Sequence, residues 1–393
     1  MSGVVIVGGG LAGVRTAEAL RSADFAGPIT LLAGESHLPY DRPPLSKSVL
    51  TQPLDIDDVA YHSEDWYEDN RIDLRLNESA ESLDPAARVV HTSAGSLPYD
   101  DVVIATGARA RDVFTDAPSG VITLRTIDDA RRLRESLRSA RRLVIVGAGF
   151  IGLEVASSAR ELGVDVVVAE ASAAPLSRSL GTEVAELVVA SARSAGVEIR
   201  CGATISALIG DDVISAVELA DGERLECDVV VVGVGSLPNI EWLADSGLDV
   251  GPLGLLCDHR GAAAHGVWGV GDVAAWSDAD GIRRRHEHWT SATEQARALA
   301  HHMTADTAFS STSTSYVWSD QFGRRINIIG DTGADADVRI VSHGSSDLFV
   351  LYARGGHLVG ACVVDNPRRM VECRRWIAAA TPVSQIPAWS HAA

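Results

Sequence analysis

Hydrophobic residues in the first half of the chain form short continuous runs, each followed by glycines and then by apolar residues spaced three and four apart. The segment at 4–20, VVIVGGGLAGVRTAEAL, predicts a strand, a turn and a helix. The segment at 143–159, LVIVGAGFIGLEVASSA, repeats this order, and the residues identical in both copies are Val5, Ile6, Val7, Gly8, Gly10, Gly13 and Ala17. This internal repeat predicts two similar α/β units.

Further continuous apolar runs follow each copy. They are ITLLAGE at 29–35, YDDVVIATG at 99–107, VDVVVAE at 164–170 and CDVVVVGVG at 227–235. Runs of this kind are typical of strands in parallel sheets that are covered on both faces. The segment at 266–276 predicts one more strand, and a helix is expected from Thr290 to Met303, where the first unit resumes.

The end of the chain has a different pattern. From Tyr316 onward, apolar and polar residues alternate in the segments at 325–330, 338–343, 348–353 and 357–364, which predicts a small antiparallel sheet. The polar run AFSSTSTS at 308–315 predicts a linker before it. The expected fold class is α/β, with two Rossmann-like dinucleotide-binding domains and a C-terminal α+β domain. The expected boundaries are 1–112 with 236–312, then 113–235, then 313–393.

Composition narrows the possible functions. The chain has 34 Lys and Arg against 53 Asp and Glu, a formal net charge of −19, which opposes binding to nucleic acid or to an anionic membrane. Its five cysteines have no spacing typical of a metal site or a disulfide framework, as expected of thiols in a reducing compartment. No signal peptide or spanning segment is recognisable in the sequence, so a soluble, cytoplasmic protein is expected.

The two glycine-rich segments both fit the GxGxxG dinucleotide fingerprint. Their glycines allow a tight turn and a close approach to a pyrophosphate, whose charge is met by the amides at the following helix N-terminus. A second strand then leads to an acid that can accept hydrogen bonds from ribose hydroxyls, Glu35 in the first copy and Glu170 in the second. With strand, fingerprint and acid present twice, two bound dinucleotides are expected.

Motifs along the whole chain resemble those of NADH-dependent, FAD-containing ferredoxin reductases of bacterial oxygenase systems, whose fold is similar to that of glutathione reductase. These motifs are PYDRPPLSK (39–47), ATGAR (105–109), GAGFIGLEVA (147–156), GVGD (269–272), HEHW (286–289) and VWSDQ (317–321). The resemblance implies that the first site holds FAD and the second holds NADH. It also implies that the C-terminal domain is altered relative to glutathione reductase.

The resemblance assigns roles residue by residue. It places the cation of Lys47 against the flavin and pairs it with Glu154, the two residues expected to be catalytic. The FAD contacts it implies are Gly8, Gly10, Ala12, Gly13, Glu35, Arg42, Lys47, Ala80, Ala105, Thr106, Gly107, Arg125, Asp272 and Trp289. The NADH contacts it implies are Gly147, Gly149, Ile151, Gly152, Glu170, Arg178 and Gly235.

Charge favours NADH over NADPH. Glu170 would repel the extra phosphate of NADPH, and no Lys or Arg lies between Ala171 and Ser177 to attract it. Arg178 is the next cation, and it leaves NADPH open as the alternative coenzyme.

The stretch 34–60 contains no cysteine, which excludes the thiol chemistry of related disulfide reductases. Electrons on the flavin must then leave to a one-electron carrier, to oxygen or to a quinone. We expect a 2Fe-2S ferredoxin, with rubredoxin as a second carrier. The alternatives are an NADH oxidase or quinone reductase, and a redox-controlled binding flavoprotein that resembles apoptosis-inducing flavoprotein.

Ferredoxins are usually acidic, so an acidic reductase needs a local cationic face to dock one. The candidate docking residues are Arg283, Arg284, Arg285, Arg324 and Arg325, with Trp318 beside the electron route and further arginines at 368, 369, 374 and 375. The same arginines are also explained as solvated surface charges, and the tryptophan as a packing residue.

Overall fold

The computed structural model describes residues 3–278, 281–305, 314–333, 335–344 and 347–390. The chain divides into two compact units. Unit 1 consists of the segments 1–41, 55–109 and 236–312, and unit 2 consists of 42–54, 110–235 and 313–393. Most of the predicted linker at 308–315 lies outside the described residues. No helix in the described part of the chain is long and apolar enough to cross a membrane.

Unit 1 is built around a parallel sheet with antiparallel additions. Its strands are β1 (Gly3–Val7), β2 (Ile29–Ala33), β3 (Ile72–Leu76), β4 (Ala80–Asp84), β5 (Val89–Thr92), β6 (Gly95–Ile104), β16 (Ser236–Pro238), β17 (Val250–Gly251), β18 (Gly254–Cys257), β19 (Ala262–Ala264), β20 (Val267–Gly269), β21 (Ala274–Ser277) and β22 (Arg283–Arg284), and β7 (Ala108–Ala110) lies at its border. Its helices are α1 (Leu11–Ser22), α3 (Glu64–Asp69) and α8 (Trp289–Thr304), with 3-10 turns at Ile56–Asp58, Glu241–Leu243 and Gly271–Val273.

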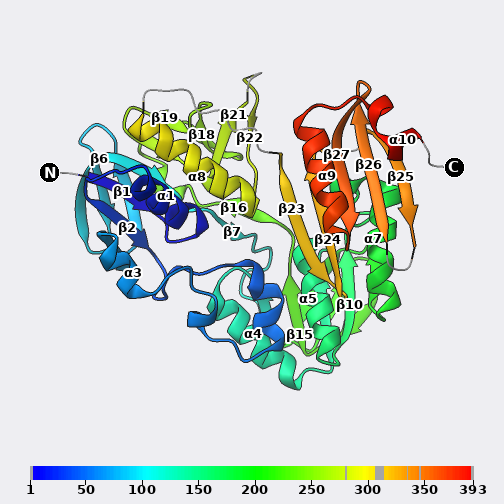
Figure 1. Ribbon diagram of the computed structural model, residues 1–393. Coiled ribbons are helices and arrows are strands. Elements are labelled where there is room, and N and C mark those ends of the chain that lie inside the picture. Colours follow the sequence, from blue (N-terminus) through cyan, green and yellow to red (C-terminus); the bar gives the residue numbers. More distant parts are fainter. Residues whose placement is uncertain (1–2, 279–280, 306–313, 334, 345–346, 391–393) are drawn as a thin grey trace. The chain divides into compact units, whose positions relative to one another are not determined.

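The main sheet of unit 1 has both faces covered, as the continuous apolar runs predict. The order β3-β2-β1-β6-β20 is parallel throughout. Val4 and Ile6 of β1 pack in one core with α1 and α8, whereas Val5 and Val7 pack in a second core on the opposite face. Figure 1 shows α1 and α8 side by side over the sheet. The sheet therefore holds the end of β1 rigidly where the glycine turn begins.

Two details of unit 1 differ from the prediction. The segment at 266–276 forms two strands, β20 and β21, because a 3-10 turn with Gly271 at φ +75° separates them and directs β21 into a different sheet. β2 ends at Ala33, so Glu35 follows the strand by two residues and does not close it. The predicted helix at 290–303 is confirmed as α8, which extends one residue further at each end.

Unit 2 contains the second parallel sheet and the C-terminal sheet. Its strands are β8 (Val121–Thr123), β9 (Arg142–Val146), β10 (Asp165–Glu170), β11 (Glu198–Cys201), β12 (Ile205–Ile209), β13 (Ala216–Leu219), β14 (Arg224–Glu226), β15 (Val229–Val232), β23 (Tyr316–Gln321), β24 (Arg324–Gly330), β25 (Asp337–His343), β26 (Leu348–Arg354) and β27 (His357–Val364). Its helices are α2 (Ser48–Thr51), α4 (Ile127–Ser139), α5 (Phe150–Glu161), α6 (Ser177–Leu180), α7 (Thr182–Ser194), α9 (Pro367–Ala378) and α10 (Pro387–Ser390), with 3-10 turns at Pro43–Ser46 and Val383–Gln385.

The second parallel sheet reproduces the first. Its order β11-β10-β9-β15-β8 places the strand before each glycine turn in the same position relative to the next two strands. The two Rossmann-like halves and the α/β fold class are therefore confirmed.

The C-terminal sheet is antiparallel, as the alternating pattern predicts, with the order β23-β24-β27-β26-β25. One face packs on α6 and α7 through Val184, Val188 and Val350, and the other packs on α9 through Cys373 and Phe349. The buried Tyr352 hydroxyl donates to the Leu180 carbonyl of α6 at 2.8 Å. The sheet thus shares its core with the second dinucleotide-binding half.

Candidate functional site

The first glycine turn joins β1 to α1 in unit 1. A Cβ at Gly13 would lie 2.0 Å from the Gly8 carbonyl oxygen, and one at Gly8, whose φ is +123°, would lie 2.2 Å from the Ala105 carbonyl oxygen. At Gly10, which caps α1, a Cβ would meet no described atom within 4 Å beyond its chain neighbours. The outer glycines therefore make the turn possible, while the middle one leaves open the space before the helix amides. This is the cradle that a pyrophosphate needs.

The predicted residues after β6 lie against this turn. The Ala105 amide donates to the Val7 carbonyl at 2.8 Å, and the Thr106 hydroxyl donates to the Asn239 carbonyl at 2.8 Å. The Asn239 side-chain amide donates back to the Thr106 carbonyl at 2.9 Å, and the Asn239 backbone amide donates to the Gly107 carbonyl at 3.0 Å. Asn239 thus fixes the segment that closes over Gly8, a role that the sequence motifs did not reveal.

The acid of the first copy, Glu35, lies in the loop after β2. Its Oε2 accepts a hydrogen bond from the Tyr40 hydroxyl at 2.5 Å. Ala80 begins β4 and pairs with Thr92 of β5, so its backbone is held within the antiparallel part of the sheet.

Asp272 lies in the 3-10 turn that separates β20 from β21. A Cβ at the preceding Gly271 would lie 2.7 Å from the Cβ of Ala12, so this turn touches the start of α1. The Gly271 amide also donates to the side-chain oxygen of Gln295 in α8 at 2.8 Å. Asp272 and the first glycine turn are therefore brought together at one end of the sheet, as a shared ligand requires.

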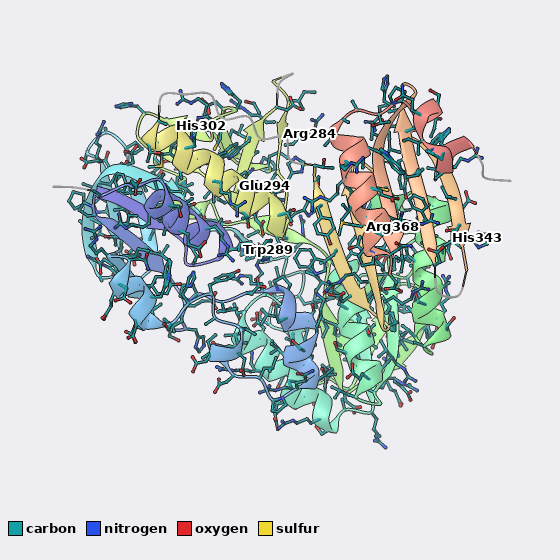
Figure 2. All side chains as sticks on the ribbon, viewed as in Figure 1. Arg284, Trp289, Glu294, His302, His343 and Arg368 are labelled. Carbon is teal, nitrogen blue, oxygen red and sulfur yellow. The ribbon has the colours of Figure 1, made fainter. Side chains whose placement is uncertain are left out.

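Trp289 begins α8, where Figure 2 labels it, with His302 further along the same helix. Its indole Nε1 donates to Asp41 Oδ1 at 2.9 Å, and the Tyr61 hydroxyl donates to the same oxygen at 3.0 Å. The Arg15 guanidinium of α1 lies 5.7 Å from the Trp289 ring centroid. Asp41 therefore orients Trp289, and the only sign of Asp41 in the sequence is its place in the motif at 39–47.

The second glycine turn joins β9 to α5 in unit 2 and has the same geometry. A Cβ at Gly152 would lie 2.3 Å from the Gly147 carbonyl oxygen, and one at Gly147 would lie 2.5 Å from the Gly233 carbonyl oxygen. A Cβ at Gly149 would meet no described atom within 4 Å beyond its chain neighbours. Each unit therefore contains a complete pyrophosphate cradle.

Two predicted residues lie around this second turn. Ile151, in the first turn of α5, is 51% exposed despite being a large apolar residue, which suits contact with a ligand. The carbonyl of Gly235 accepts a hydrogen bond from the Arg111 amide at 2.9 Å, which anchors the segment after β15.

Glu170 ends β10 and is held by its own loop. Its Oε2 accepts from the Ala148 amide at 2.7 Å, and its Oε1 accepts from the Ser172 hydroxyl at 2.6 Å and the Ser172 amide at 2.8 Å. Partial burial opposes the charge, but these hydrogen bonds and the nearby Arg178 outweigh it and lower the pKa of Glu170. The acid is therefore ionised and fixed, with Arg178 of α6 close enough to contribute.

Lys47 and Glu154 form an ion pair in unit 2, with the Lys47 Nζ 2.7 Å from Glu154 Oε2. Glu154 is in α5 and its side chain is 6% exposed. Lys47 follows the 3-10 turn formed by PPLS and also donates to the Pro43 carbonyl at 3.1 Å. The two prolines fix that turn, so the cation is presented to the carboxylate by a rigid segment.

Three further residues join this pair. Glu154 accepts hydrogen bonds from the hydroxyls of Ser46 and Ser319, and Gln321 donates to Ser319. No sequence pattern distinguishes these three residues, although all of them belong to the motifs PYDRPPLSK and VWSDQ that carry the resemblance. Nearby in the same unit, the Arg42 guanidinium donates to the Arg125 carbonyl at 2.5 Å, so these two predicted cofactor contacts adjoin each other.

Most of the candidate docking arginines have acidic neighbours. Arg283, Arg284 and Arg285 pair with Asp249, Asp278 and Glu287, and Arg324 and Arg325 pair with Asp365 and Asp320. Helix α9 is different because it carries arginines at 368, 369, 374 and 375 with a single acid, Glu372, which pairs with Arg368. Figure 2 labels Arg368 on this helix. Trp318 stacks on Tyr316 with ring centroids 5.9 Å apart, and Arg374 lies over the Tyr316 ring.

Two dinucleotide cradles on parallel sheets, with a lysine–glutamate pair beside the second, define a pyridine-nucleotide flavoprotein. Residues 2–296 match the family described as pyridine nucleotide-disulphide oxidoreductase, and residues 316–388 match a reductase C-terminal domain. The chain belongs to the pyridine nucleotide-disulphide oxidoreductase family. The bound groups of this family, FAD and NAD(H), are the two dinucleotides that the cradles fit.

Individual relatives narrow the class. The chain is 36% identical over 383 residues to the ferredoxin reductase component of chlorobenzene dioxygenase from Cupriavidus sp. (strain PS12), covering 94% of this chain and 92% of the relative. The ferredoxin reductase for the CYP199A2 system from Rhodopseudomonas palustris matches with TM-score 0.91 and 32% identity over 97% of this chain and 96% of that one. The structure of a covalent putidaredoxin reductase–putidaredoxin complex matches with TM-score 0.92 and 29% identity, covering 97% and 94%. The predicted resemblance to ferredoxin reductases is thus confirmed.

Proposed function

We propose that this protein takes a hydride from NADH onto FAD and passes the electrons singly to a 2Fe-2S ferredoxin that supplies an oxygenase. The observation that carries the proposal is the joint presence of two pyrophosphate cradles and a reductase C-terminal domain, over a length shared with ferredoxin reductases of oxygenase systems. The absence of cysteine from 34–60 supports it, because the flavin then has no thiol to reduce.

For the FAD site, we propose the residues that unit 1 gathers at one end of its sheet. They are Gly8, Gly10, Ala12 and Gly13 at the pyrophosphate, Glu35 at a ribose, Asp272 at the ribityl chain, and Ala80, Ala105, Thr106, Gly107 and Trp289 around them. Bound FAD supplies the ability to accept two electrons together and to release them one at a time. Arg42 and Arg125, which contact each other, are the remaining proposed FAD contacts.

For the NADH site, we propose Gly147, Gly149, Ile151 and Gly152 at the pyrophosphate and Glu170 and Arg178 at the adenosine end, with Gly235 as a further contact. A fixed, ionised Glu170 accepts hydrogen bonds from ribose hydroxyls and repels a 2′-phosphate, which is the physical basis for preferring NADH.

Lys47 and Glu154 are the proposed catalytic pair. A buried carboxylate is costly without partners, and the ammonium of Lys47 with two hydroxyls offsets that cost. The pair therefore holds one positive and one negative group at fixed positions beside the start of α5. There the two charged groups can orient the nicotinamide and flavin rings.

For ferredoxin docking, the arginines of α9 are the most strongly supported of the candidates, because the clusters at 283–285 and 324–325 have a carboxylate beside each guanidinium. Complementary charge between this helix and an acidic ferredoxin would guide association. Trp318 remains a proposed neighbour of the electron route.

The sequence also leads to proposals for the domain boundaries and for the location in the cell. We propose the domain boundaries stated from the sequence, an FAD domain of 1–112 and 236–312, an NADH domain of 113–235 and a C-terminal domain of 313–393. The cysteine pattern supports a cytoplasmic location.

The function is tested by comparing electron acceptors. Purified holoenzyme with NADH should reduce a 2Fe-2S ferredoxin far faster than it reduces oxygen or a quinone. Fast peroxide or quinol formation without a carrier protein would point instead to an oxidase or quinone reductase. A long-lived complex of reduced flavin and NAD⁺ with slow turnover on every acceptor would point to the redox-controlled binding protein.

A further inference from the structure

The carboxylate of Glu154 is held from both ends by separate parts of unit 2. Oε2 is 2.7 Å from the Lys47 Nζ and accepts from the Ser46 hydroxyl at 2.5 Å. Oε1 accepts from the Ser319 hydroxyl at 2.7 Å. The first two donors come from the segment with the rigid proline turn, and the third comes from β23 of the C-terminal sheet.

The hydrogen-bond direction at Ser319 is set by Gln321. The side-chain amide of Gln321 donates to the Ser319 oxygen at 3.2 Å, and both residues are at least 97% buried. A serine hydroxyl has a single proton, so when its oxygen accepts from Gln321 its own proton is directed to Glu154. The alternating strand pattern places both side chains on the same face of β23, which is why one can orient the other.

Loss of Ser319 would leave the carboxylate fixed only at Oε2. A carboxylate held at one oxygen can rotate, and a buried oxygen without a donor gains by turning toward water or another donor. Lys47 would then lose its fixed counter-charge, even though no atom of Lys47 had changed. The hydroxyl of Ser319 therefore acts on the proposed catalytic pair from the C-terminal sheet of the same unit.

We propose that Ser319, oriented by Gln321, is a positioning residue that holds Glu154 in register with Lys47 for the reaction between NADH and the flavin. This proposal rests on the proposed function of that pair. It gives the C-terminal region a part in the NADH half of the cycle, separate from any part in docking a ferredoxin.

The test uses Ser319→Ala and three comparison variants, of which Gln321→Leu removes the amide that orients the Ser319 hydroxyl. Ser319→Thr keeps the hydroxyl. Ser157→Ala removes a different bond between the same parts of the chain, because the Ser157 oxygen accepts from the Phe322 amide at 2.6 Å, and it leaves the donors to Glu154 in place. All variants are prepared as FAD-loaded protein.

Flavin reduction by NADH is followed anaerobically in a stopped-flow instrument without ferredoxin. We expect Ser319→Ala to lower the limiting rate about tenfold or more, as loss of a preorganised donor does, while the Kd for NAD⁺ changes less than about twofold. Ser319→Thr should restore most of the rate, Gln321→Leu should lower it less than Ser319→Ala, and Ser157→Ala should match the unaltered protein. A normal rate in Ser319→Ala, or equal losses in Ser319→Ala and Ser157→Ala, would overturn the proposal.

Thermal unfolding gives a second readout that does not depend on activity. Ser319→Ala should lower the Tm by several degrees, and it should lower it much less when Glu154→Ala is already present, because the two residues then no longer interact. Equal Tm losses in both backgrounds would mean that Ser319 does not act through Glu154. Since no ferredoxin is present in either experiment, a failure of the ferredoxin assignment leaves both results interpretable.

Discussion

The two glycine turns are nearly the same structure, but the acids that follow them have different hydroxyl donors. In both turns a Cβ at the third glycine would clash with the carbonyl oxygen of the first, and a Cβ at the middle glycine would meet no described atom within 4 Å beyond its chain neighbours. Glu35 accepts a hydrogen bond from the hydroxyl of Tyr40, five residues away, and Glu170 accepts from the hydroxyl and amide of Ser172, two residues away, and from the Ala148 amide in the glycine turn. The shared geometry suits the pyrophosphate, which both dinucleotides have. In the proposed sites the two acids accept hydrogen bonds from the riboses, and Glu170 selects between coenzymes.

The largest expected effects come from the third glycine of each turn. In Gly13→Ala or Gly152→Ala, the new methyl would lie 2.0 or 2.3 Å from a backbone oxygen, so the turn itself must move. We expect Gly13→Ala to lose FAD and Gly152→Ala to keep FAD but bind NADH at least about tenfold more weakly. Flavin absorbance per protein and NAD⁺ titration measure these losses. If either variant lost both dinucleotides equally, the two cradles would not be independent.

The middle glycines give a sharper comparison, because the added methyl meets no described protein atom there. Gly149→Ala should therefore keep the Tm of the unaltered protein within about 2 °C, while NADH affinity falls about tenfold because the methyl occupies the approach of the pyrophosphate. Gly10→Ala should weaken FAD retention in the same way. Unchanged affinity in Gly149→Ala would mean that the pyrophosphate does not lie at this helix N-terminus.

Removing the second acid should alter coenzyme choice more than overall affinity. Glu170→Ala removes the acceptor for the ribose hydroxyls and the charge that repels a phosphate, so the ratio of kcat/KM for NADPH to that for NADH should rise about 10- to 100-fold. Glu35→Ala, the matched change in the first copy, should leave this ratio where it is. A constant ratio in Glu170→Ala would remove the basis for coenzyme selection proposed here.

The smallest effect is expected for Ser172→Ala, which removes one donor to Glu170. The pKa of Glu170 is lowered in the folded protein, so its contribution to stability is present above the unfolded pKa and is lost as pH falls through the lowered folded value. Without the Ser172 hydroxyl the folded pKa of Glu170 should rise toward its unfolded value, so the loss should be smaller and should be complete at a higher pH, and coenzyme selection should weaken a few-fold.

Tm measured from pH 7 down to about pH 3, which passes through the usual pKa of a glutamate and below it, tests the shift. The control is Ser177→Ala, because the Ser177 hydroxyl donates to the Ala174 carbonyl at 2.8 Å in the same loop and its removal spares the donors to Glu170. Identical pH curves for the two variants would show that Ser172 does not hold the acid.

The repeat, the parallel sheets and the antiparallel C-terminal sheet follow from short-range patterns, and for that reason the sequence was sufficient to predict them. The prediction of a single strand at 266–276 was wrong because Gly271, with a positive φ, divides an apolar run that continues on both sides. Lys47 and Glu154 could be paired only through the family resemblance, since they lie far apart in the chain. Ser46 and Ser319 were missed because serines have no pattern of their own, and only the folded chain brings their hydroxyls to one carboxylate. The pairing of Arg283–Arg285 with acids likewise could not be predicted from the sequence, because only the folded chain brings these side chains together.

The hydroxyl of Tyr352 reaches from the middle of the C-terminal sheet to the carbonyl of Leu180, at the end of the short helix that carries Arg178. The C-terminal sheet is consequently bonded directly to a helix of the second dinucleotide-binding half. In the proposed NADH site, any coupling free energy that this hydrogen bond transmits from the helix to the sheet acts equally from the sheet on coenzyme binding.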